Sequence, residues 1–155
     1  MRYFEDYEDG RKERFGAYLV SREEVIEFAS RYDPQPFHLD DMAAAASPIF
    51  DRLAASGWHT CSMVMRMLTD HWTEGGYFSL GGTGVDELRW LKPVYPGDVL
   101  SVEAEVLSKS TPKSRPEMGF VNFRLVVFNQ DEDVVVTMKV TNIQRRRPVQ
   151  ALTSA

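Results

Sequence analysis

The sequence predicts an α+β fold, in which a curved antiparallel sheet is wrapped around one long helix. The first observation is the stretch 56–72, where apolar residues recur at helical intervals over about four turns. The second is a series of four strand-like segments after this helix, with a fifth ahead of it. A helix with so broad an apolar face needs cover on several sides, which a curved sheet supplies.

The chain length and composition are those of one ordinary globular domain. The chain has 155 residues, of which 43% are hydrophobic and 26% charged, so a core is expected and disorder is not indicated. We expect one domain over 1–147 and a flexible tail over 148–155. The net charge of −5 gives no general attraction to nucleic acid or acidic lipid, so the expected partner is a small molecule.

Cysteine content and hydropathy indicate a cytoplasmic protein. Cys61 is the only cysteine, which excludes an internal disulfide and suits a reducing compartment. The first residues carry no apolar signal segment, and charged residues interrupt every long hydrophobic stretch before it reaches 18 residues. We therefore expect a cytoplasmic location and no membrane span.

Caps and prolines set the elements ahead of the long helix. Ser21 and Glu24 have the spacing of a capping box, which begins a helix over 22–31. Pro34 stops that helix, because its ring is incompatible with a continuing helical turn. A second, short helix follows Asp40, whose carboxylate is expected to cap it rather than to take part in catalysis.

The long helix is expected to be largely buried, because its apolar residues cover a wide face. The residues that define this face are Cys61, Val64, Met65, Leu68 and Trp72, with Thr60, Met63 and Met67 beside them. Gly75 and Gly76 end the helix.

Strands are expected on both sides of the long helix. They span 10–20, 84–90, 99–110, 119–128 and 134–143. The segments 93–98 and 129–133 have the composition of turns. A curved sheet of this size leaves an exposed edge, which the sheet of a second copy would cover, so we expect a homodimer.

Asp33 and His38 are the strongest candidates for a functional site. Pro34 and Pro36 lie between them and stiffen the loop, so an acid and an imidazole are held in a fixed relation. Such a pair can take a proton from water and deliver one elsewhere. Taken singly, each residue also has a structural interpretation: Asp33 as a turn residue that ends a helix, and His38 as a buried histidine bonded to a carbonyl.

Three segments share their order and spacing with a known family. They are Asp33 to Asp40 (DPQPFHLD), Ala55 to Trp58 (ASGW) and Leu91 to Asp98 (LKPVYPGD). With them the chain resembles, over nearly its whole length, the MaoC-like dehydratases, a hotdog-fold group that includes the (R)-specific enoyl-CoA hydratases. The first segment is the specific one, because an Asp, four residues and a His form the catalytic signature of the hydratases. The third is common to many hotdog proteins and indicates the fold more than the activity.

The resemblance implies reversible hydration of a 2-enoyl thioester to a 3-hydroxyacyl thioester, with Asp33 and His38 as the catalytic pair. Negative charge develops on the thioester oxygen, and the backbone N–H of Gly57 is the expected donor to it. Ser56 and Trp58 are expected beside the acyl chain, although Trp58 fits a core position equally well. No metal or organic cofactor is implied, since the thioester acidifies its own α-carbon. Coenzyme A enters as part of the substrate, and an acyl carrier protein is the alternative carrier.

Two positions depart from the family pattern, and both bear on the substrate. Gln35 stands where the hydratases usually have Asn, so the side-chain amide is kept at greater length. Met65 occupies a helix position where the hydratases often carry a small polar residue, which would change the polarity of the acyl pocket.

The remaining candidates have plainer interpretations. His59 and His71 lie twelve residues apart and do not share a metal-binding face, and Cys61 has no evident base beside it. The glycine-rich segment 81–84 precedes no helix that would bind phosphate. The basic run 145–147 fits the phosphates of coenzyme A, but a solvated strand end is the simpler interpretation.

Two alternatives to a hydratase stay open. A hotdog thioesterase usually places an acid on its long helix, and here the acids toward that helix, Asp70 and Glu74, lie at its far end. A non-catalytic subunit that binds acyl thioesters would bind them without turnover.

Overall fold

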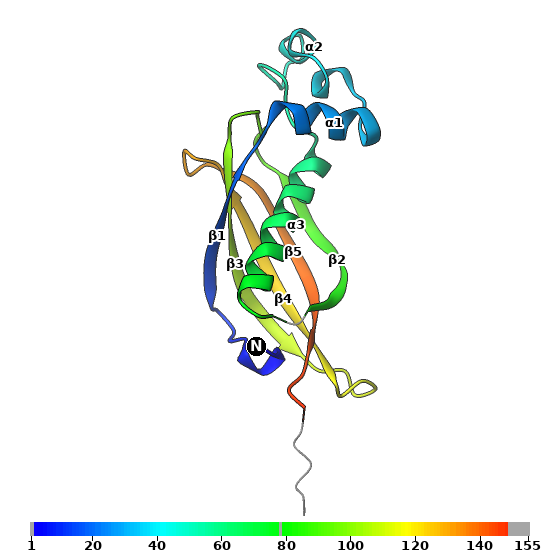
Figure 1. Ribbon diagram of the computed structural model, residues 1–155, viewed down its shortest axis with the longest axis vertical. Helices are drawn as coiled ribbons and strands as arrows, with labels where there is room; N and C mark the ends of the chain where they lie inside the picture. Colours follow the sequence, from blue (N-terminus) through cyan, green and yellow to red (C-terminus); the bar gives the residue numbers. More distant parts are fainter. Residues whose placement is uncertain (1, 78, 149–155) are drawn as a thin grey trace, which may run out of the picture.

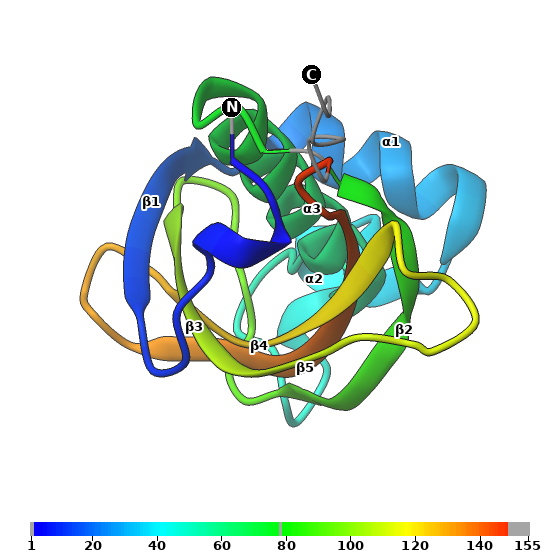
Figure 2. The same ribbon diagram turned by 90° about the horizontal axis from the view of Figure 1, so that it is seen from below.

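The fold is the expected α+β arrangement of a curved antiparallel sheet around a long helix. The computed structural model describes residues 2–77 and 79–148. The expected tail over 148–155 lies outside the described residues except for Pro148. The sheet has five strands in the order β1-β3-β4-β5-β2, and every neighbouring pair is antiparallel. Figure 2 shows the sheet curving around helix α3.

The strands agree with the sequence expectation except at the start of one of them. They are β1 (Lys12–Leu19), β2 (Ser79–Trp90), β3 (Val99–Ser110), β4 (Met118–Phe128) and β5 (Val134–Arg145). Strand β2 was expected over 84–90 but begins five residues earlier, so the glycine-rich segment 81–84 belongs to the strand. Three register shifts along the pairing of β2 with β5 accommodate these irregular residues.

Within residues 2–77 and 79–148, three α-helices and two short 3-10 helices complete the structure. They are η1 (Phe4–Asp6), α1 (Arg22–Tyr32), η2 (Pro36–His38), α2 (Asp41–Ala45) and α3 (Gly57–Glu74). In Figure 1, α1 and α2 lie at the end of the molecule where α3 begins, and the N-terminal segment lies at the end where α3 finishes. The two ends of α3 are therefore in separate neighbourhoods. In the described part of the chain, no helix has the length and apolar character that crossing a membrane requires.

The caps of the helices follow the sequence signals. The Ser21 hydroxyl accepts a hydrogen bond from the N–H of Glu24 (3.2 Å) at the start of α1. The Asp40 carboxylate accepts one from the N–H of Ala43 (2.9 Å) at the start of α2, as expected for a cap. Gly75 follows the last residue of α3, where its N–H donates to the carbonyl of His71.

One face of α3 packs against the concave side of the sheet. The residues of this face differ from the expected ones, because His59 is buried and Met65 is exposed. The buried residues of α3 are His59, Thr60, Met63, Val64, Met67 and Leu68. The prediction that Met65 belongs to this face was wrong, because its side chain is 54% exposed. Three- and four-residue spacing leaves two neighbouring helical stripes as alternatives, and only packing against the sheet selects between them.

The sheet supplies the rest of the core. Inward-facing residues alternate along β3, β4 and β5, and β2 is exposed along almost its whole length. Strand β2 is one edge of the sheet, since it pairs only with β5. It carries the exposed apolar side chains Leu80, Val85 and Trp90. An exposed apolar edge of this kind is the feature from which the sequence predicted a homodimer.

Candidate active site

The loop after α1 holds the two residues of the sequence-predicted proton-transfer pair. Asp33 ends α1, and its N–H donates to the carbonyl of Ala29 (3.0 Å). Gln35 is extended, as expected for a residue that precedes a proline. The next residues, Pro36 to His38, form the single turn η2, which the sequence did not predict. The loop is thus short and internally bonded, as the two prolines required.

His38 is buried, and its contacts fix which ring nitrogen faces Asp33. Its Nδ1 lies 2.7 Å from the carbonyl oxygen of Ala54. A carbonyl oxygen can only accept, so Nδ1 carries the proton in the neutral ring. The other nitrogen, Nε2, lies 3.5 Å from Oδ2 of Asp33. Neutral His38 therefore presents an unprotonated Nε2 toward the carboxylate.

Two neutral side chains hold the Asp33 carboxylate in place. The amide nitrogen of Gln35 donates to Oδ1 (2.7 Å), and the hydroxyl of Ser56 donates to Oδ2 (2.7 Å). Burial by itself would raise the pKa of Asp33, but these two hydrogen bonds and the nearby His38 outweigh it and lower the pKa. Asp33 is thus kept ionised and oriented.

The segment that begins α3 lies beside this pair. Ser56 is fully buried and also accepts a hydrogen bond from the N–H of Trp58 (3.3 Å), so it caps α3 and holds Asp33 at once. Gly57 is the first residue of the helix, where backbone N–H groups have no partner within the helix. Trp58 is 60% exposed, so it is not a core residue.

Trp90, at the end of β2, is a neighbour of Gly57 that the sequence did not predict. Its indole N–H donates to the carbonyl of Gly57 (3.0 Å). A Cβ atom on Gly57 would lie 2.4 Å from Cε2 of the same indole, far inside contact distance. The space in which a Gly57 side chain would lie is therefore taken by Trp90.

Asp33, His38, Gly57, Trp58 and Trp90 line one cavity of about 390 Å³, whereas Ser56, which was expected beside the acyl chain, is not among its lining residues. Its polar lining residues are Asp33, Gln35, His38, Thr60 and Lys92, and Gly57 also lines it. Its apolar side consists of Ile49, Phe50, Ala55, Trp58, Trp90, Leu91, Pro93, Val94 and Val136. This volume lies within the usual range for small-molecule sites. The arrangement can hold a water molecule against an acid and an imidazole, beside a mostly apolar space.

The other candidate residues lie elsewhere. His59 is buried and stacks on Phe28, with ring centroids 4.8 Å apart. Within the described residues, no group of three or more His, Cys, Asp or Glu side chains could hold a metal ion. Two of the three arginines in 145–147 pair with acids of the N-terminal segment, Arg146 with Glu5 and Arg147 with Asp6.

His71 pairs with an acid at the far end of α3. Its Nε2 lies 2.9 Å from Oε2 of Glu13, and its ring stacks on Phe15 with centroids 3.9 Å apart. Asp70, one of the two helix acids relevant to a thioesterase, accepts hydrogen bonds from Arg66 at this same end. Among the described residues that line the 390 Å³ cavity, Asp33 is the only carboxylate.

Comparisons with known proteins identify the family and the fold. A family model described as a MaoC-like domain matches residues 8–121. A MaoC-like dehydratase from Rhodospirillum rubrum is 38% identical, with a TM-score of 0.85 over 96% of this chain and 100% of that chain. An (R)-hydratase from A. caviae involved in PHA biosynthesis is 26% identical, with a TM-score of 0.66 over 92% of this chain and 98% of that chain.

The fold itself recurs in a more distant protein. A Mycobacterium tuberculosis protein described as having a double hotdog fold is 16% identical, with a TM-score of 0.77 over 97% of this chain and 46% of that chain. The five-stranded sheet around α3 is therefore a hotdog fold. With a matching family model over most of its length and the fold in common, the chain belongs to the MaoC-like domain family.

Proposed function

We propose that the protein catalyses the reversible hydration of a 2-enoyl thioester to a 3-hydroxyacyl thioester. The observation that carries this proposal is that Asp33 at the end of α1, His38 in η2 and Gly57 in α3 line the same cavity. Hydratases and dehydratases of this family support the reaction class, and the A. caviae relative is an (R)-hydratase. The proposed reaction uses no metal or organic cofactor, because the thioester acidifies its own α-carbon.

The acid and the imidazole would divide the handling of one water molecule. The Nε2 of His38 and Oδ2 of Asp33 lie 3.5 Å apart, and both would accept hydrogen bonds from a water bound in the cavity. The lowered pKa of Asp33 makes its carboxylate a weaker base than an ordinary aspartate, which favours a role in orienting the water and stabilising the imidazolium. Neutral His38 would take a proton from water as the oxygen bonds to the β-carbon, and the imidazolium would then return that proton to the α-carbon.

Gly57 would stabilise the charge that develops during this addition. As the β-carbon is attacked, electrons move onto the thioester oxygen, so a donor fixed at that oxygen favours the transition state. The N–H of Gly57 begins the 18-residue helix α3, where the helix dipole favours negative charge. Loss of this N–H donor would lower the rate of hydration by a factor on the order of 10²–10³.

The carrier and the assembly are part of the same proposal. We take the substrate to be an acyl-CoA or acyl-carrier thioester, since the apolar part of the cavity lining would suit an acyl chain, and we take the location to be the cytoplasm. We take the working unit to be a homodimer, because the edge strand β2 exposes the apolar side chains Leu80 and Val85 along its length. Light scattering on the purified protein measures its mass and tests this assembly.

Incubation with crotonyl-CoA and longer 2-enoyl-CoAs tests the function. Hydration is expected to consume the absorbance of the conjugated double bond without release of thiol. An Asp33→Asn, His38→Gln double variant is expected to have lost this activity. Full activity in the double variant, or release of free coenzyme A by the wild type, would contradict the proposal, and the second outcome would point to a thioesterase.

A further inference from the structure

The indole of Trp90 occupies the space into which a side chain on Gly57 would project. The three atoms of Trp90 nearest to a Cβ placed on Gly57 would be Cε2 at 2.4 Å, Nε1 at 2.6 Å and Cδ2 at 2.8 Å. A hydrogen bond from Nε1 of Trp90 to the Gly57 carbonyl (3.0 Å) holds the ring in this position. The ring of Trp58 also contacts the indole edge-on, with the ring centroids 5.4 Å apart.

Strand pairing in the sheet directs the Trp90 side chain toward the cavity. Trp90 is paired with Val136 of β5, and directly opposite residues of an antiparallel pair project from the same face of a sheet. Val136 is buried and lines the same cavity. Trp90 is therefore a wall of the cavity on the same face of the sheet as Val136.

The position of this wall limits what can follow the thioester carbonyl. The amide nitrogen and the Cα of Gly57 are bonded neighbours, so a carbonyl oxygen that accepts from this N–H at about 2.9 Å rests beside the indole. The buried residues Ala55, Thr60, Val94 and Val136 line the same cavity. The indole therefore takes up volume that an acyl chain lying against these residues would otherwise occupy.

We infer that Trp90 is a specificity-determining residue that restricts the site to short acyl chains by filling the space against Gly57. The inference rests on the proposed function, because it concerns the acyl chain of the same thioester. It adds a residue that neither the motifs nor the proton-transfer chemistry identify. Trp90 does not take part in the reaction; it sets the length of substrate that reaches Asp33 and His38.

Binding of saturated acyl-CoAs tests the inference separately from turnover, because these compounds have no double bond to hydrate. Calorimetric titration of the full chain with butyryl-CoA and octanoyl-CoA gives a ratio of two dissociation constants. The wild type is expected to bind butyryl-CoA more tightly. In Trp90→Ala, and less strongly in Trp90→Leu, the ratio is expected to shift toward octanoyl-CoA by about 10-fold, since even one methylene that fails to fit costs about this much.

Trp58→Ala is the matched comparison, because it removes the same kind of side chain from the same cavity without vacating the space at Gly57. Its ratio is expected to shift less than that of Trp90→Ala. An unchanged ratio in Trp90→Ala, a shift toward butyryl-CoA, or no binding of either compound by the wild type would overturn the inference. If the ratio shifts as expected but no 2-enoyl-CoA is hydrated, the inference stands and the proposed function fails.

Discussion

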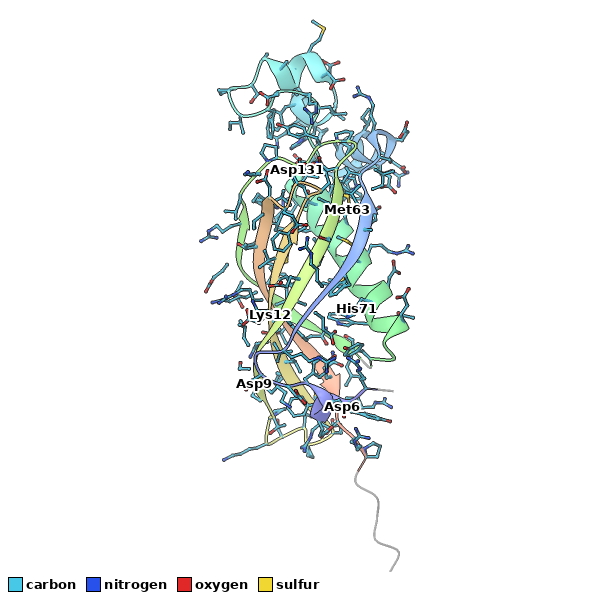
Figure 3. All side chains as sticks on the ribbon, turned by 90° about the vertical axis from the view of Figure 1, so that its left-hand side faces the viewer. Asp6, Asp9, Lys12, Met63, His71 and Asp131 are labelled. Atoms are coloured by element: carbon cyan, nitrogen blue, oxygen red, sulfur yellow. The ribbon has the colours of Figure 1, made fainter. Side chains whose placement is uncertain are left out.

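The two ends of helix α3 each hold an acid next to a histidine, and only one pair has the surroundings of an active site. At the start of α3, Asp33 and His38 lie 3.5 Å apart beside a cavity of about 390 Å³. At its end, Glu13 and His71 lie 2.9 Å apart beside a cavity of about 20 Å³. Figure 3 labels His71 near the end of α3. The cavity beside Glu13 and His71 has room for only one water molecule.

The two acids also differ in how completely they are paired. Asp33 accepts from two neutral side chains and faces the neutral nitrogen of His38. The groups around Glu13 are His71, Tyr77, Arg2 and Arg11. Burial would raise the pKa of Glu13, but these donors and charges outweigh it and hold the pKa at about 2.

The comparison shows that residue type alone does not define the site. An acid next to a histidine can perform proton transfer only if a face of the pair is open to a reactant. Glu13 joins strand β1, the end of α3 and the N-terminal segment, so its charges stabilise the fold. Asp33 is held by neutral donors, which fix its direction and leave the open cavity in front of it.

The largest expected effect is a difference in hydration activity between variants of His38 and variants of His71. Asp33→Asn and His38→Gln are each expected to lower kcat for enoyl-CoA hydration by about 10²–10⁴, the range for loss of acid–base catalysis. Because the two residues act on one water, the double variant is expected to lose little more than the worse single variant. His71→Gln, the control at the other end of α3, is expected to stay within a few-fold of wild type. Equal losses in His38→Gln and His71→Gln would break the comparison.

The next effect separates the two acids by stability. Glu13→Gln is expected to lower the free energy of unfolding at pH 7 by on the order of 2 kcal/mol, because a carboxylate with a folded-state pKa of about 2 is lost. The unfolded carboxyl titrates near pH 4.3, so the wild type has this stability above about pH 4.3 and loses it as the pH falls toward 2.

Urea unfolding of wild type and Glu13→Gln at pH 7 and pH 3 measures this dependence. The difference between the two proteins is expected to be smaller at pH 3. Hydration activity is expected to be unchanged, since Glu13 lies outside the cavity that holds Asp33. A difference in stability that grows on acidification would contradict the role assigned to Glu13.

A smaller effect concerns the donors that hold Asp33. Gln35→Met keeps the length of the side chain but removes the amide that donates to Oδ1, so the pKa of Asp33 is expected to rise toward its ordinary value. Ser56→Ala is expected to raise the pKa as well, but it also removes the cap of α3 and so destabilises the protein. Carbon NMR titration of the aspartate carboxyls, with the Asp33 signal assigned from Asp33→Asn, measures the shift. A pKa that stays low in Gln35→Met would show that this amide does not hold the carboxylate ionised.

The sequence predicted the open pair and could not predict the closed one, for a physical reason. Asp33 and His38 are five residues apart, so the prolines and the caps, which act locally, determine their relation. Glu13 and His71 are 58 residues apart and meet only because β1 lies along the end of α3. Trp90 was missed for the same reason, since the pairing of β2 with β5 brings it to Gly57. The signal that could have found it is a large aromatic residue directly before the Leu91 to Asp98 turn.

The prediction of which face of α3 is buried was limited in a similar way. The residues 60, 63, 64, 67 and 68 of α3 could be assigned from helical spacing, whereas the exposure of Met65 could not. Adjacent stripes of a helix have the same periodicity, and the choice between them depends on the curvature of the sheet that covers the helix. Locally determined features were thus predictable, and contacts between distant strands and helices were not.

The smallest expected effect tests whether position or mere presence of an acid near His38 matters. Asp40 lies two residues after His38, and its carboxylate accepts from the N–H of Ala43 (2.9 Å) at the start of α2. Asp40→Ala is expected to lower the free energy of unfolding by about 1 kcal/mol, as for other lost helix caps, and Asp40→Asn by less. Both variants are expected to keep enoyl-CoA hydration within a few-fold of wild type, because this carboxylate faces a backbone amide and not the cavity. Thermal unfolding and initial rates measure the two quantities on the same preparations. If Asp40→Asn, with the fold intact, lost as much activity as Asp33→Asn, the assignment of the acid to Asp33 alone would be wrong.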